Sequence, residues 1–172
     1  EGPERLFGEM TRLALKLEKL AAAGGLAKVS DRDVHYAPIA ARWLGPKGLE
    51  GIKASLGMSP EELAEVESLS DHDLEELREQ QGRRPKPAER LAYDLFFGSD
   101  AVAEGLEVYF DEEQIEAALA IAKLMHQHLK DCRHISFDNA EESGLYVVSP
   151  VLLVGRTKSG YLAGLWSYEV RT

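Results

Sequence analysis

Four residues that can bind a metal lie close together in the segment HQHLKDCRH: His126, His128, Cys132 and His134. Imidazole nitrogen and thiolate sulfur are the ligands that zinc prefers in proteins. On a helix, His128 and Cys132 share a face, whereas His126 lies off that face and His134 lies beyond the helix end. Structural zinc sites usually draw their ligands from two separated pairs, which this sequence lacks. We interpret the histidines as complements of a helix C-terminus, with zinc as the alternative, and expect no metal or cofactor.

Other motifs with catalytic residue types also favour structural roles. The segment GRTKSG at 155–160 has the letters of a phosphate-binding loop, but a strand follows it where that loop requires a helix. Ser149 precedes a proline and lacks the Gly-x-Ser-x-Gly setting of a nucleophile. The acidic runs at 111–113 and 141–142 occupy a helix start and a loop, where charge is common. The sequence therefore predicts a protein that is not an enzyme.

The composition indicates a folded acidic protein. Its 172 residues are 44% hydrophobic and 29% charged, and its net charge is −10. This charge has the wrong sign for gripping phosphate backbones, so direct nucleic-acid binding is not expected, whereas a basic protein partner is compatible with it. The sequence has neither a signal segment nor an apolar run of about 20 residues, so no membrane association is expected. A single cysteine, Cys132, excludes an internal disulfide and predicts a cytoplasmic protein.

The first half of the sequence predicts helices. Leucine and methionine recur every three or four residues over 4–23, and Gly24-Gly25 ends this stripe. Prolines and glycines then predict short, interrupted helices up to about residue 57. Capping boxes that begin at Ser59 and Ser70 each predict a helix start, and the second helix is expected to end near Gly82.

A basic, proline-containing joint, GRRPKPAER at 82–90, separates this half from the rest. We predict a helical region over 1–82 and an α/β region over 83–172. The four cations of the joint could hold phosphate, but a solvated linker is the interpretation that we favour. These cations are Arg83, Arg84, Lys86 and Arg90.

The second half predicts two helices followed by strands. Residues 88–97 have a helical pattern, and Asp111 or Glu112 opens a longer helix with acidic residues in its first turn. From residue 133 onward, HISF, GLYVVSPVLLVG and YLAGLWSYEV predict strands. Both faces of the last hairpin are apolar, so the hairpin should be covered on both sides with Trp166 in the core. The predicted class is α+β, with helices layered on a small antiparallel sheet.

The order DEEQ, helix, LYVV and LLVGRTKSGYLAGLWSYEVRT resembles the nuclease A inhibitor family over about residues 97–172. The likeness is densest at VGRTKSGYLAGL and at the closing Val-x-Thr. The resemblance implies an α/β/α sandwich that blocks the active site of a metal-dependent, non-specific nuclease. The family presents its final threonine to the nuclease metal, so the implied partner-binding residues are Thr172 and its neighbours Arg171 and Glu169.

The family's first half also supplies a strand of the sheet and a glutamate near the nuclease metal, whereas residues 1–90 here predict helices. No such glutamate is carried over to this chain. The alternative function is an adaptor or regulatory protein-binding module that kept the scaffold, in which the helical first half binds another protein.

Overall fold

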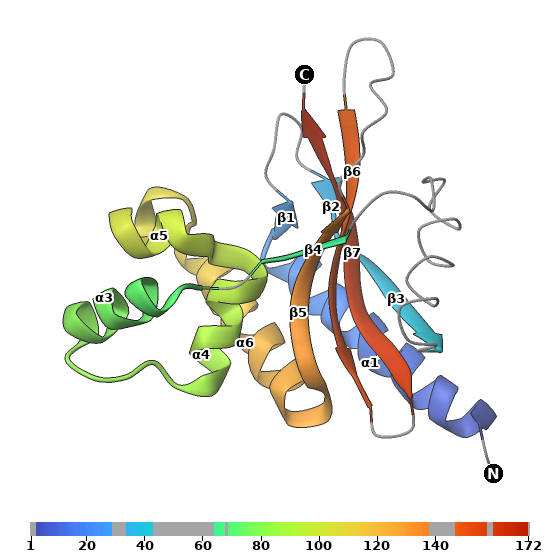
Figure 1. Ribbon diagram of the computed structural model, residues 1–172. Coiled ribbons are helices and arrows are strands. Elements are labelled where there is room, and N and C mark those ends of the chain that lie inside the picture. The colour runs from blue at the N-terminus through green and yellow to red at the C-terminus, as the bar shows by residue number, and fades with distance from the viewer. Residues whose placement is uncertain are drawn as a thin grey trace.

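The computed structural model describes residues 3–28, 34–42, 64–67, 69–137, 147–157 and 160–171 (Figure 1). Its α-helices are α1 (Pro3–Ala23), α3 (Asp71–Gln81), α4 (Pro87–Ala92), α5 (Gly98–Glu104) and α6 (Glu112–His128). A π-helical segment, η1 (Tyr93–Phe97), joins α4 to α5, and a 3₁₀ turn, η2 (Leu106–Val108), follows α5. The strands are β1 (Ala27–Lys28), β2 (Val34–His35), β3 (Ala37–Arg42), β4 (Ala64–Glu67), β5 (Lys130–Phe137), β6 (Val147–Arg156) and β7 (Tyr161–Arg171).

Five strands form one antiparallel sheet in the order β3-β7-β6-β5-β4, and β1 pairs with β2 beside it. The three inner strands are consecutive in sequence and come from the second half of the chain. Both edge strands, β3 and β4, come from the first half, on the other side of the joint 82–90. The sheet therefore combines both halves of the sequence, and the predicted α+β class is confirmed.

The helices predicted to begin at Ser70 and near Asp111 lie where the sequence places them. The Ser70 side chain accepts a hydrogen bond from the Asp73 amide at the start of α3, and Gly82 ends this helix in a left-handed conformation. At the start of α6, Asp111 accepts from the Gln114 amide, and the Gln114 side chain accepts from the Asp111 amide. Because each cap satisfies amides that the helix leaves open, local sequence determines these boundaries.

Two segments in which helices were expected form strands instead. Residues 37–42 are β3, and residues 64–67, just after the predicted helix start at Ser59, are β4. β3 pairs with β7 from Ala37↔Trp166 to Arg42↔Tyr161, and β4 pairs with β5. Pairing with distant strands thus overrides the weak local preference of these segments. The rest of the predicted helices between residues 43 and 63 lies outside the described residues.

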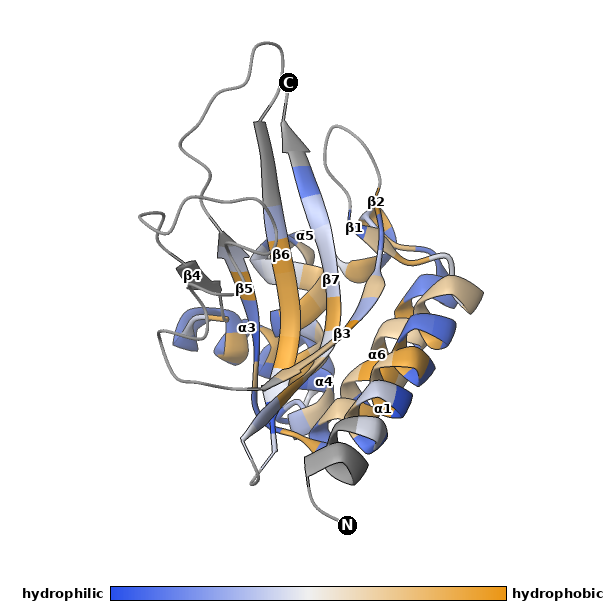
Figure 2. Ribbon diagram, turned by 90° about the vertical axis from the view of Figure 1, so that its right-hand side faces the viewer, coloured by the Kyte–Doolittle hydropathy of each residue, from blue (hydrophilic) through white to orange (hydrophobic). Residues whose placement is uncertain are grey.

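The main core lies between the sheet and the layer formed by α1 and α6 (Figure 2). α1 packs against β3, β7 and α6, and α6 in turn packs against α4. Apolar side chains on one stripe of each helix meet the inner strands, as the amphipathic patterns require. Fully buried members of this core include Leu17, Leu77, Leu95, Ile121, Met125, Leu153 and Leu165. Within the part of the chain that the structure describes, no helix combines the length and apolarity needed to cross a membrane.

Both faces of the last hairpin are buried at residues 151–154 of β6 and 161–165 of β7, as the apolar pattern predicts. The four consecutive residues 151–154 of β6 are each at most 1% exposed, and consecutive strand residues point to opposite faces. The prediction that Trp166 lies in the core is wrong, because its side chain is only partly buried. Trp166 forms the last β3–β7 pair, with Ala37, so β3 does not flank β7 beyond this position. The alternation of residues along β7 predicts which face of the sheet Trp166 lies on, but it does not predict where the neighbouring strand β3 ends.

Candidate functional site

The paired ends of β6 and β7 form a two-stranded ribbon, residues 147–150 and 168–171 (Figure 1). The β5–β6 register ends at Ser136↔Val151, and the β3–β7 register ends at Ala37↔Trp166. Pro150, which has no amide hydrogen to donate, occupies the first ribbon position after the β5 pairing stops. Among the described residues, the two ribbon strands pair only with each other. The ribbon therefore extends the sheet at the end opposite the start of α1.

Two of the three residues that the family resemblance implies for partner binding belong to this ribbon. Glu169 pairs with Ser149 and is partly buried, and Arg171 pairs with Val147 as the last described residue of β7. Thr172 lies outside the described residues. Ser167, just before the ribbon, donates its hydroxyl hydrogen to the backbone oxygen of Val34 at 2.8 Å. This bond fixes the ribbon base against β2.

An aromatic pair marks the base of the ribbon. The rings of Trp166 and Tyr168 meet edge to face, with centroids 5.0 Å apart and an interplanar angle of 76°. Both side chains are partly buried, so part of each ring remains accessible. Tryptophan and tyrosine are the side chains that contribute most often to binding energy at protein interfaces. The arrangement of aromatic pair and ribbon suits protein recognition.

The structure separates the four zinc candidates. His126 and His128 are exposed at the end of α6, whereas His134 is buried on the sheet. Cys132 is partly buried, and burial, followed by the charge of Asp131, raises the pKa of its thiol to about 11. A thiol with this pKa is protonated at neutral pH in the metal-free protein. No three metal-binding side chains come together in the described ranges.

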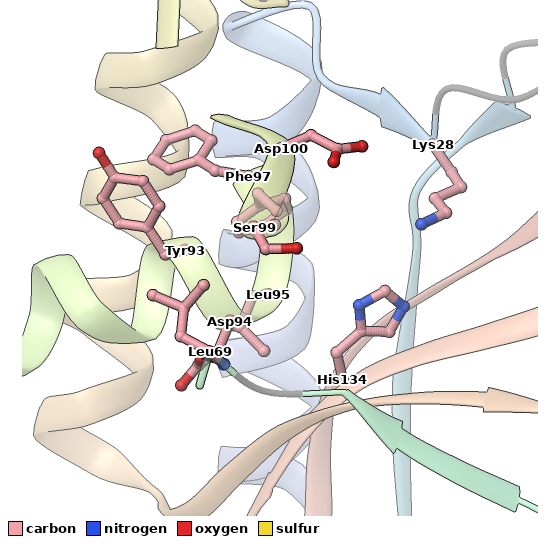
Figure 3. Close-up of a pocket in the computed structure, with 11 residues that line it drawn as sticks. Lys28, Leu69, Tyr93, Asp94, Leu95, Phe97, Ser99, Asp100 and His134 are labelled. Atoms are coloured by element: carbon pink, nitrogen blue, oxygen red, sulfur yellow. Dashed lines mark hydrogen bonds between the residues drawn. The ribbon is translucent and has the colours of Figure 1, made fainter. Parts of the chain in front are cut away.

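A cavity of about 520 Å³ lies between η1, the start of α5, β1 and β5 (Figure 3). The polar ends of Lys28, Ser99, Asp100 and His134 point toward a common space, and these residues come from three elements, β1, α5 and β5. A cation, a hydroxyl, a carboxylate and an imidazole can together hold a small polar molecule by hydrogen bonds and charge. The only local signal of this cavity in the sequence is Asp94, a polar residue within the apolar run LAYDLFF.

Burial controls protonation at this cavity. Burial, followed by the positive charge of Lys28, lowers the pKa of His134 to about 4, although a hydrogen bond with the Asp94 backbone opposes the shift. His134 is therefore neutral at pH 7. Burial also raises the pKa of Asp94, while the hydrogen bond from the Leu69 amide and the charge of Arg90 lower it. At neutral pH, the imidazole of His134 thus adds no charge to the cavity.

Asp94 also joins η1 to the segment before α3. Its Oδ1 accepts a hydrogen bond from the Leu69 amide at 2.8 Å, and the Leu69 side chain is buried. Replacement of Asp94 by alanine leaves this partly buried amide without that acceptor. We expect Asp94→Ala to lower the free energy of unfolding by about 1–3 kcal/mol in urea denaturation. Asp94→Asn keeps an acceptor and should lose less than half as much; an equal loss would contradict this role.

The four cations of the joint 82–90 are exposed, in agreement with a solvated segment. Arg83 donates to the Glu89 carboxylate at 2.9 Å and to the Arg84 backbone oxygen at 3.2 Å. Arg84 and Arg90 line a second hollow beside β5 instead. The joint therefore contributes both a structural ion pair and an open cationic surface.

Comparison of the chain with models of known protein families and with curated proteins gives no match.

Proposed function

We propose that the chain is a non-enzymatic protein inhibitor that binds a metal-dependent, non-specific nuclease and blocks its active site. The observation that carries this proposal is the projecting β6–β7 ribbon, 147–150 and 168–171. Hydrogen-bonded strands present side chains more rigidly than a loop does, so less entropy is lost on binding. The ribbon presents Glu169, and Arg171 and Thr172 complete the proposed contact.

Charge supports the choice of partner. A nuclease must present a basic surface to hold nucleic acid, and this chain has a net charge of −10. Opposite net charges accelerate association and favour the correct orientation. Carboxylate and hydroxyl oxygens such as those of the Glu169 and Thr172 side chains are of the type that Mg²⁺ and Ca²⁺ accept as ligands. The accessible parts of Trp166 and Tyr168 provide apolar contact area beside these oxygens.

The proposal is tested by titrating the protein into purified metal-dependent, non-specific endonucleases and measuring DNA cleavage. Stoichiometric inhibition of at least one enzyme of the panel is expected. A panel that remains fully active at a tenfold molar excess of the protein contradicts the proposal. Native mass spectrometry of the inhibited mixture should give a complex of the two proteins.

The ribbon residues should determine the affinity. We expect Glu169→Lys to weaken nuclease binding by about 2–5 kcal/mol, because it reverses a charge facing a basic surface. Tyr168→Ala should cost about 1–3 kcal/mol and Thr172→Ala a similar amount, since each removes a direct contact. Isothermal titration calorimetry measures these changes, and thermal melts confirm that each variant is folded.

Glu79→Lys provides the matched control. Glu79 is exposed on α3, away from the ribbon, and its replacement changes the net charge by the same amount as Glu169→Lys. The control should retain affinity within about threefold, which corresponds to less than 1 kcal/mol. Equal losses in the two lysine variants would show that overall charge, rather than the ribbon, determines binding.

A further inference from the structure

A hollow of about 690 Å³ lies between the joint 82–90, the end of α6 and the start of β5. Three permanent cations line it, Arg84, Arg90 and Lys130, and all three are exposed. Leu91 and Leu129 are buried beneath the same hollow. Lys130 pairs with Arg156, whereas the ribbon ends at Val147 and Arg171, so the hollow lies at the opposite end of β6. It is therefore separate from the proposed nuclease contact.

Three arginines near the hollow form ion pairs with carboxylates, whereas the cations that line the hollow do not. Arg83 binds Glu89, Arg78 binds Glu75, and Arg156 binds Asp131. Within the described part of the chain, Arg84, Arg90 and Lys130 form no ion pair of this kind. On a protein with a net charge of −10, three cations around one hollow are a local excess of positive charge. Unpaired cations that face a common space attract an anion.

The carboxylates that line the hollow are already engaged. Asp94 accepts the Leu69 amide hydrogen, and the Asp131 carboxylate is paired with Arg156. The pairing with Arg156 also lowers the pKa of Asp131, so this carboxylate remains ionised within its own ion pair. The charge of Arg90 acts on Asp94 and that of Lys130 acts on Asp131, but neither carboxylate forms an ion pair with a cation of the hollow. The unbalanced charge in the hollow is thus positive.

The backbone around the hollow restricts where the cations lie. Pro85 follows Arg84, and a residue before proline is confined to extended conformations. On the other wall, the β5–β6 register shifts between Lys130 and Arg133, and Asp131 has a positive φ of 52°. Such a bulge redirects the strand and is common beside binding sites. The backbone on each side of the hollow therefore has fewer accessible conformations than the backbone of an ordinary loop.

We infer that this hollow binds a small molecule with at least two linked phosphate groups. Arginine donates two parallel hydrogen bonds to phosphate oxygens, and lysine adds a point charge, so three such cations match a multiply charged anion. The hollow has room for two linked phosphate groups, and three cations match the charge of a diphosphate better than that of a monophosphate. The phosphate groups lie between Arg84 and Arg90 on one wall and Lys130 on the other.

The test uses inorganic pyrophosphate as the probe in isothermal titration calorimetry with the full chain. Binding is expected at low ionic strength and should weaken by about tenfold between 50 and 200 mM NaCl, because salt screens the attraction between the anion and the exposed cations. Arg84→Ala, Arg90→Ala and Lys130→Ala should each weaken binding by about five- to tenfold. Thermal melts of each variant establish that the fold is retained.

Arg83→Ala is the matched control, since it removes the same charge from the neighbouring position but leaves the three cations of the hollow in place. Its affinity for pyrophosphate should stay within about twofold of that of the unmodified protein. An equal loss in Arg83→Ala overturns the inference, because it would show that the joint attracts anions without a defined site. Absence of pyrophosphate binding at 50 mM NaCl overturns it as well. Neither outcome bears on nuclease inhibition.

Discussion

Replacement of Gly164 by alanine is expected to lower the free energy of unfolding by at least about 4 kcal/mol, a large part of the stability of a typical domain. Gly164 lies in β7 opposite Val154 of β6. A Cβ atom at Gly164 would overlap the Leu153 carbonyl oxygen and would lie 2.9 Å from Val154 Cα. Both obstacles are backbone atoms of a strand that is paired on each side. The sheet can accept the methyl group only by losing strand pairing.

The expected loss is measured by urea denaturation of soluble protein or by the soluble fraction after expression. Gly8→Ala in α1 serves as the control, because the nearest atom to its Cβ would be Arg12 Nη1 at 3.8 Å. This control should stabilise the protein by up to about 1 kcal/mol, the usual advantage of alanine in a helix. A Gly164→Ala protein with the stability of the unmodified chain would contradict the close approach of β6 and β7.

Acidification from pH 7 to pH 4 is expected to lower the free energy of unfolding by about 3 kcal/mol through His134 alone. The pKa of this imidazole falls from 6.5 to about 4 in the folded protein. The unfolded chain therefore binds a proton near pH 6.5, whereas the folded chain does not until about pH 4. The stability due to neutral His134 is fully present above pH 6.5 and declines as the pH falls toward 4.

His134→Gln isolates this contribution, since glutamine does not titrate. Urea unfolding at pH 7 and at pH 4.5 should show a decrease about 2 kcal/mol smaller in this variant than in the unmodified protein. His128→Gln, at an exposed position, should retain the full decrease. The raised pKa of Asp94 makes the folded protein more stable as the pH falls, which opposes the effect of His134. Because both proteins contain Asp94, the comparison between them largely removes this contribution. Equal pH dependence in the unmodified and His134→Gln proteins would argue against a buried neutral imidazole.

Local chemistry was enough to predict the capped helices and the inner strands. The capping box at Ser70 and the acidic first turn that follows Asp111 each lie within a few residues of a helix start, so a short window of sequence contains these signals. The continuous apolar residues of β6 likewise indicate, within a short stretch of sequence, that both faces of the strand are buried. These features depend on neighbours along the chain.

The edge strands could not be predicted in this way. β3 has the sequence APIAAR, which does not alternate in polarity. β4 has AEVE, which alternates over only four residues and follows the helix start predicted at Ser59. They become strands because β7 and β5 offer unpaired hydrogen-bonding groups. The predicted burial of Trp166 was wrong for a related reason, because the exposure of this side chain depends on where β3 ends.

The candidate sites also combine features that the local sequence predicts with features that depend on the fold. The resemblance to the nuclease A inhibitor family pointed to the end of β7, but the ribbon itself follows from where pairing with β3 and β5 stops. The cavity beside His134 and the cationic hollow collect residues from elements that are distant in sequence. No motif in the sequence links Lys28 to Asp100, although both line the cavity beside His134. Only the fold brings such residues together.

The origin of β3 in the first half has a consequence for synthesis on the ribosome. Arg42 of β3 pairs with Tyr161 of β7, which is made 119 residues later. At roughly 5–20 residues per second, β3 waits about 6–24 s for its partner. α1 waits as well, because it packs against both β3 and β7. Until β7 emerges, the nascent chain has an open strand and an uncovered apolar helix face, both of which attract chaperones and promote aggregation.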